Sequence, residues 1–306
     1  MMPASRAATC SPAPNDYSVG FRPYSTYRLQ SCNLTVYHRH PRSTGSMDQL
    51  LHVHRPPREI PEPDISVLPS FVLIAPPPYT SPRTKETAPS LCESWRTALA
   101  DLPPAVAAQF TIKEARFNAA TLAKEFGTFD CLVSPANAFG IMDGGYDLAL
   151  SRAFIVDDDI WALTNAVQDV LHKRYRGYLP PGSCTMVPLS PALTTSNPLG
   201  CTTLAVVPTM RTPESVSWHR DLVYESMWNL LAALWRWNEG ERPDAAPQVQ
   251  KVLLTGLGTG HGRIGFDKCA KQMFLAALNF ARGWGEHPRW EDVLTRAKEM
   301  DSTRDL

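Results

Sequence analysis

From residue 71 onward, short apolar runs alternate with longer amphipathic segments, and this alternation restricts the fold more than any other feature. Six runs are predicted as strands, and most of them are apolar throughout, which is typical of strands buried on both faces: 71–76, 110–116, 131–135, 184–189, 203–210 and 251–257. Six further segments have helical spacing of apolar residues: 91–100, 118–126, 147–154, 158–174, 219–237 and 266–282. Strands separated by helices form a sheet that helices cover on both faces. The sequence therefore predicts an α/β fold, a three-layer α/β/α sandwich with a central, mostly parallel mixed sheet.

Proline content divides the chain into parts. Of the 28 prolines, 15 fall in the first 90 residues, and proline removes a backbone donor and disfavours helix in the residue before it. We expect a disordered Pro-, Arg- and Ser-rich tail over 1–65. The folded domain is expected over 66–285, followed by a C-terminal extension over 286–306 that is a short helix or disordered.

Charge and composition exclude several classes of partner. Thirty basic residues balance thirty acidic ones, so no net field draws the chain to nucleic acid. No run approaches the roughly 18 apolar residues of a membrane span, so we expect no membrane contact. Seven scattered cysteines without a C-x-x-C pair suit a reducing compartment. We expect an intracellular monomer, cytoplasmic or nuclear, with mitochondria as the alternative because the N-terminus shares the composition of transit peptides.

Three other patterns have plain structural interpretations. His38/His40 and His52/His54 form H-x-H pairs, but no regular pattern holds them as metal ligands. The acidic triplet 157–159 is interpreted as charge favoured in the first turn of a helix. Four tryptophans are expected to pack in the core and not to form a stacking platform: Trp218, Trp228, Trp235 and Trp237. We therefore expect no bound metal.

Two glycine-rich loops follow predicted strands, where ligands bind in such sheets. The first is "SPANAFGIMDGGYDLAL", 134–150, in which Pro135 ends a strand and three glycines precede a helix expected from about Asp147. The second is "TGLGTGHGRIGF", 255–266, after the last strand. Free amides at a strand-to-helix turn, together with the positive end of a helix, form an anion site. Both loops thus predict phosphate or diphosphate binding.

Familiar cofactor motifs do not explain these loops. A formal G-x-G-x-x-G lies at Gly260, Gly262 and Gly265, but it falls in the last strand-helix unit, with no later strand to carry a ribose-binding acid. A Walker A pattern and a G-x-S-x-G nucleophile elbow are both missing from the sequence. We therefore expect no nicotinamide, flavin or other cofactor.

The first loop resembles the first ligand loop of macrodomains, whose pattern is N-A-A-N, a spacer, a glycine run, an apolar residue, then Asp and a helix. Asn137 and Asp147 stand ten residues apart, the spacing found in macrodomains that hydrolyse ADP-ribose linkages. "LLTGLGTG" is similar to the second loop of that family, which wraps the diphosphate. The resemblance spans roughly 68–283 and implies a macrodomain fold that binds ADP-ribose or ADP-ribosylated protein.

The resemblance also implies roles for single residues. Asn137 and Asp147 are the catalytic candidates. Asn137 is expected to hydrogen-bond the distal ribose, and Asp147, expected to be ionised at a helix start, to accept from the ribose hydroxyls or to orient a water. The plain alternative is that Asn137 closes a turn and Asp147 caps the helix. His261 is a further catalytic candidate because imidazole titrates near neutral pH. Other ligand contacts are expected at Asn118, Ser134, Ala136, Phe139, Gly144, Gly145, Tyr146, Thr255, Gly256, Leu257, Gly258, Thr259 and Gly260.

Three residues depart from the macrodomain pattern. Ser134 replaces the first Asn of N-A-A-N, Asp143 interrupts the glycine run, and Asn118 stands nearest to the position of the adenine-contacting Asp. Three functions stay open. The first is a hydrolase of ADP-ribose linkages, acting on modified protein or on a distal-ribose derivative such as the 1''-phosphate or the O-acetyl form. The second is a reader without turnover, and the third is a scaffold that has lost the ligand.

Overall fold

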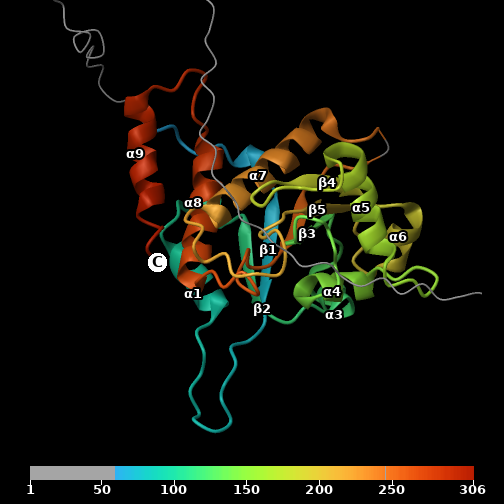
Figure 1. Cartoon of the computed structure of the whole chain (residues 1–306). Helices are drawn as coiled ribbons and strands as arrows, with labels where there is room; N and C mark the ends of the chain where they lie inside the picture. The colour runs from blue at the N-terminus through green and yellow to red at the C-terminus, as the bar shows by residue number, and fades with distance from the viewer. Residues whose placement is uncertain (1–58, 245) are drawn as a thin grey trace, which may run out of the picture. The chain divides into compact units, whose positions relative to one another are not determined.

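The computed structural model describes residues 59–244 and 246–306, so the predicted tail and its histidine pairs lie largely outside it. Its sheet has six strands in the order β2-β1-β6-β3-β5-β4, and only the β4–β5 pair is antiparallel. The strands are β1 (Ser70–Ala75), β2 (Phe110–Glu114), β3 (Cys131–Ser134), β4 (Thr185–Pro188), β5 (Thr203–Val206) and β6 (Lys251–Leu254). All six predicted strands and the mostly parallel mixed sheet are confirmed (Figure 1).

The six predicted helices are present, and five further helical elements join them within the described residues. The predicted set is α1 (Leu91–Ala100), α3 (Ala119–Phe126), α4 (Gly145–Ala153), α5 (Ala162–Tyr175), α7 (Leu222–Arg236) and α8 (Phe266–Arg282). The additional helices are α2 (Pro104–Ala107), α6 (Pro191–Ser196) and α9 (Trp290–Asp301), with a 3-10 turn η2 (Ile65–Val67) and a π turn η3 (Trp237–Glu241). Within the described residues, no helix combines the length and apolar character needed to cross a bilayer.

Helices cover the sheet on both faces, as the apolar strands require. Along β1, Phe71 and Leu73 point into a core shared with α1, α7 and α8, whereas Val72 and Ile74 point into a second core shared with α3, α4 and α5. Figure 1 shows these two groups of helices on opposite sides of the strands. The three-layer α/β/α sandwich is therefore confirmed. The helices leave the carboxyl edge of the sheet uncovered, and the loops that follow the strands lie there.

Two expectations about packing were wrong. The acidic triplet is not in the first turn of a helix, because Asp157 and Asp158 take positive φ in a turn and α5 begins only at Ala162. Trp218 and Trp235 are exposed, at 74% and 43% of their surface, instead of lying in the core. Trp218 precedes the start of α7. Trp235 follows the buried Leu234 and so lies outside the buried face of the helix. The spacing of the tryptophans therefore predicted more burial than the structure has.

The C-terminal residues pack back onto α7 and α8. The guanidinium of Arg304 donates two hydrogen bonds to the carboxylate of Asp221, with N–O distances of 2.8 and 2.6 Å. Gln272 on α8 donates to the Thr303 hydroxyl at 3.1 Å. The segment after α9 is thus tied to the side of the sandwich that holds α8, whose first residue lines the site described next.

Candidate active site

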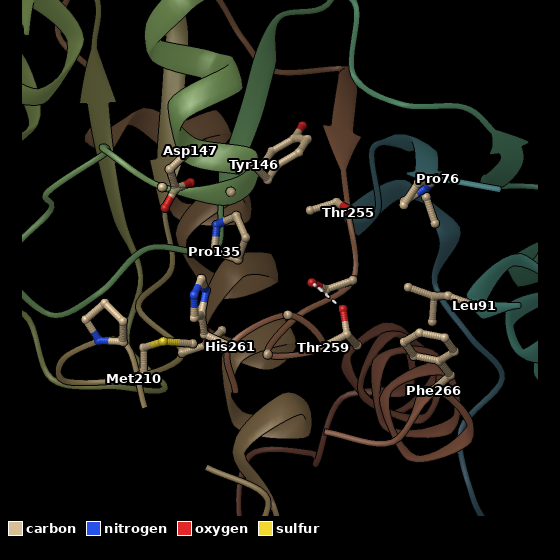
Figure 2. Close-up of a pocket in the computed structure, with 18 of the residues that line it drawn as sticks. Pro76, Leu91, Pro135, Tyr146, Asp147, Met210, Thr255, Thr259, His261 and Phe266 are labelled. Atoms are coloured by element: carbon tan, nitrogen blue, oxygen red, sulfur yellow. Dashed lines mark hydrogen bonds between the residues drawn. The ribbon is translucent and has the colours of Figure 1, made fainter. Parts of the chain in front are cut away.

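A cleft of about 520 Å³ runs along the carboxyl edge of the sheet. Its walls come from the β1–α1 segment, the residue after β2, the β3–α4 loop, the segment after β5 and the β6–α8 loop. Figure 2 shows Pro135, Met210 and His261 on one side, and Pro76, Leu91 and Phe266 on the other. An open α/β sheet places its ligand sites at this edge, so the two glycine-rich loops lie where the sequence predicted.

Asn137 closes the β3–α4 loop with its own side chain. Its Oδ1 accepts hydrogen bonds from the amides of Phe139 and Ile141 at 3.1 and 3.3 Å, and its Nδ2 donates to the Ile141 carbonyl at 2.7 Å. Asn137 lines the cleft, but these bonds occupy its amide group. The structure therefore gives Asn137 the turn-closing role that the sequence left as the alternative.

The start of α4 opens into the cleft without a side-chain cap. Gly144 is the N-cap residue and supplies no acceptor, and Gly145 has a φ of +55°, which a residue with a Cβ rarely adopts. By contrast, the Ser90 hydroxyl caps α1 at the amide of Glu93. The first amides of α4 thus face the cleft beside the positive end of the helix, which favours an anion.

Asp147 lies in that first turn, with its carboxyl group half-buried in the cleft wall. Burial raises its pKa to about 7, the hydrogen bond from Ser134 opposes this rise, and the negative charge of Asp143 adds to it. The expectation that Asp147 stays ionised was therefore wrong, because loss of hydration outweighs the stabilisation expected from the helix dipole. Near neutral pH both protonation states are populated.

Tyr146 and Thr209 also line the cleft, but their hydroxyl groups are buried. The Tyr146 ring packs edge-on against Phe117 at 5.4 Å between centroids, and burial raises the pKa of its phenol, which stays neutral. Among the described residues, neither the Tyr146 Oη nor the Thr209 Oγ1 finds a hydrogen-bond partner, although both atoms are buried. Because both oxygens are buried, neither hydroxyl is open to a ligand in the cleft.

The β6–α8 loop lines the cleft and packs closely against α1, because glycine leaves room for this contact. A Cβ on Gly256 would lie 2.5 Å from the Leu91 side chain, and Gly258 has a φ of +68°. The Thr259 hydroxyl donates to the Gly256 carbonyl at 3.4 Å, drawn as a dashed line in Figure 2. His261 is exposed on this loop, and its ring points toward Pro135, on the same side of the cleft as Asp147 (Figure 2).

Most of the expected contacts line the cleft, and four do not. Asn118 is exposed and caps α3 at the amide of Thr121, 2.9 Å away. Ser134 is buried behind Asp147, and Leu257 is buried in the core. Phe139 packs edge-on against Tyr178 instead, outside the lining. The lining residues from the expected set are Ala136, Asn137, Gly144, Gly145, Tyr146, Asp147, Thr255, Gly256, Gly258, Thr259, Gly260 and His261.

Sequence reasoning missed three parts of the cleft wall: the β1–α1 segment from 76 to 90, Arg116 after β2, and the segment after β5 with Thr209 and Met210. Pro76, Pro77, Pro78 and Tyr79 line the cleft, and the segment then runs away from the sheet as a hairpin-like excursion (Figure 1). A bridge between Thr80 and Thr87 closes it. Their positions in the sequence could have identified these parts, because each follows a strand of the mostly parallel sheet and so reaches its carboxyl edge.

The fold is an α/β/α sandwich with a cleft between two glycine-rich loops. No protein-family model and no curated protein matches the chain. Among solved structures the chain is similar to the Oceanobacillus iheyensis macrodomain with ADP, at 14% identity and a TM-score of 0.37, over 57% of this chain and 84% of that one. A mutant of the same macrodomain with ADPR gives 14% identity, a TM-score of 0.36 and coverage of 58% and 88%. Both of these solved structures are macrodomains.

Proposed function

We propose that the chain binds ADP-ribose in the cleft and hydrolyses a linkage at its distal ribose. One observation carries the proposal: a carboxyl group, Asp147, is held in the first turn of an uncapped helix, inside a cleft that two glycine-rich loops enclose. The cleft volume of about 520 Å³ suits a ligand of nucleotide size. The resemblance of both loops to macrodomain ligand loops supports the same ligand.

The diphosphate is assigned to the space between the two loops. The amides at the start of α4 approach it from the β3 side, and the backbone of the β6–α8 loop approaches from the other side. α8 also begins without a side-chain cap, at Gly265. Backbone donors at two helix starts stabilise an anion without a bound cation. Among the residues that the structure describes, no three His, Cys, Asp or Glu side chains gather as metal ligands.

The chemistry is assigned to Asp147. In its ionised form Asp147 accepts a proton from a water that attacks the linkage, and the leaving group departs with the bonding electron pair. His261 lies on the same side of the cleft and, when protonated, returns a proton to the leaving group (Figure 2). A pKa of about 7 suits a group that must take up and release a proton near neutral pH. The substrate is ADP-ribosylated protein or a distal-ribose derivative such as the 1''-phosphate or O-acetyl form.

A reader of ADP-ribose without turnover is the second candidate, and Asn137 favours it. Its amide is occupied by Phe139 and Ile141, so it offers fewer free groups to the distal ribose than the resemblance implies.

We further propose that the protein acts as a monomer in a reducing intracellular compartment. The five described cysteines are free thiols, which supports that compartment.

The test compares the full chain with Asp147→Asn, which keeps the shape of the side chain. Calorimetric titration with ADP-ribose, with AMP and NAD as controls, measures binding, and release of ADP-ribose from an ADP-ribosylated protein measures turnover. We expect both proteins to bind ADP-ribose and the variant to lose about 100-fold or more in turnover. Equal turnover in both proteins would exclude Asp147 as the acid-base group. Binding without turnover by the unmodified chain would establish the reader.

A further inference from the structure

The charged side chains that line the cleft are separated by sign. Its acids, Asp143 and Asp147, both belong to the β3–α4 loop. Among the described lining residues, Arg116 is the one Lys or Arg, and it follows β2. The sheet order β2-β1-β6-β3 puts three inter-strand steps between these strands, or about 14 Å. The cleft is thus acidic at one end and basic at the other.

Arg116 is held at its end by the backbone. The amide of Ala115 donates to the carbonyl of Ala75 at 2.8 Å, which continues the β1–β2 pairing to the residue before Arg116. Arg116 is exposed and makes no hydrogen bond or ion pair with another described residue. Pro76, Pro77 and Tyr79 line the cleft beside it. Its backbone is held at this end of the cleft, and its unpaired guanidinium next to apolar walls is available to an anionic group on a ligand.

The position of Arg116 suggests what that anion is. This step rests on the proposed function, which puts the distal ribose at Asp147 and the diphosphate between the glycine-rich loops. The adenosine of an extended ligand then lies toward β1 and β2, where it carries no charge that would pair with Arg116. We propose that the β2 end of the cleft binds a phosphate on the adenosine ribose, so that the protein prefers ADP-ribose bearing a 2'-phosphate over ADP-ribose itself.

The experiment titrates the full chain with ADP-ribose and with 2'-phospho-ADP-ribose, and repeats both titrations with Arg116→Ala, Arg116→Lys and Arg152→Ala. Arg152, on α4, is also exposed and unpaired among the described residues but does not line the cleft, so it controls for the loss of one positive charge. We expect about ten-fold tighter binding of the phosphorylated ligand. The preference should vanish in Arg116→Ala, weaken in Arg116→Lys, and stay in Arg152→Ala.

Each other outcome overturns a different statement. Equal affinity for the two ligands in the unmodified chain overturns the phosphate subsite and leaves ADP-ribose binding intact. A preference that persists in Arg116→Ala, or that Arg152→Ala removes equally, overturns the assignment to Arg116. No binding of either ligand by a folded sample overturns the proposed function, and the subsite with it. A true subsite preference should also shrink as salt is raised, because the added contact is ionic.

Discussion

The hydroxyl of Ser134, the last residue of β3, donates a hydrogen bond to Oδ1 of Asp147 in the first turn of α4, at 2.7 Å. Ser134 is fully buried, so the sheet edge itself fixes the direction of the Asp147 carboxyl group. A donor to a carboxylate stabilises its ionised form. Ser134 is therefore a positioning residue that also sets the proton affinity of Asp147.

Removing that donor should move the pH dependence of turnover. Ser134→Ala takes away the bond that lowers the pKa of Asp147, so this pKa should rise above about 7. If ionised Asp147 is the active form, the pH of half-maximal rate moves upward, and the rate at pH 7 falls. A pH–rate profile of ADP-ribose release measures the shift.

A matched control exists between α1 and α8, on the other face of the sheet. Ser94 donates to Oδ1 of Asp267, also at 2.7 Å, and neither residue lines the cleft. Ser94→Ala should leave the profile unchanged. A profile that is the same in Ser134→Ala and in the unmodified chain would show that the bond does not tune the reaction.

Asp147 should also make stability depend on pH. Its pKa is raised from 3.8 to about 7, so between these values the folded protein keeps a proton that the unfolded chain has lost. The contribution of Asp147 to the free energy of unfolding is therefore fully present below pH 4 and decreases as the pH rises through 7. The unfolding free energy of Asp147→Asn minus that of the unmodified protein should be about 2 kcal/mol larger at pH 8 than at pH 4. This value is reduced to allow for solvent at the cleft.

Urea unfolding of both proteins at pH 4 and at pH 8 gives the four free energies needed. The comparison across pH removes the effect of the amide itself, because Asn does not titrate. A difference between the two proteins that is the same at both pH values would mean that the carboxyl group is hydrated like an ordinary surface Asp.

Gly256→Ala should destabilise the fold by about 1–3 kcal/mol. The new methyl group would meet the Leu91 side chain at 2.5 Å and the Thr259 hydroxyl at 2.7 Å, so these two side chains have to move out of their packed positions. Gly260 lies in the same loop, has nothing within 4 Å of such a methyl group and does not have positive φ. Gly260→Ala should change the unfolding free energy by less than about 0.5 kcal/mol. Equal thermal shifts for both variants would contradict this packing.

Asp221→Asn should loosen the C-terminal segment. The hydrogen bonds and charge of Arg304 lower the pKa of Asp221, so this contribution is present above the unfolded pKa and is lost as pH falls. We expect a loss of about 1 kcal/mol at pH 7, because the pair is bidentate but partly exposed, and a smaller loss as the pH falls below the unfolded pKa of 3.8. Asp305→Asn is the control, since its pair with Arg220 is long and exposed and should contribute little. Similar losses in both variants would exclude a specific role for Arg304.

The local pattern of the sequence was sufficient for the architecture. Apolar runs such as 71–76 and 251–257 can be buried on both faces only in the middle of a sandwich, and they became β1 and β6. The glycines of both loops were also informative, because positive φ at Gly145 and close packing at Gly256 are properties of the residue type. The local pattern does not predict the burial of individual side chains, as the exposed Trp218 and Trp235 show.

The chemistry of the cleft was decided by contacts between distant segments. Asp147 was expected to be ionised because only its helix was visible in the sequence, whereas burial in the cleft wall raises its pKa. Arg116 enters the cleft only because β2 pairs with β1 at the edge of the sheet. Spacing along the chain thus determined which backbone turns form. Hydration and charge at the site depend on neighbours in space, and only the tertiary structure brings those together.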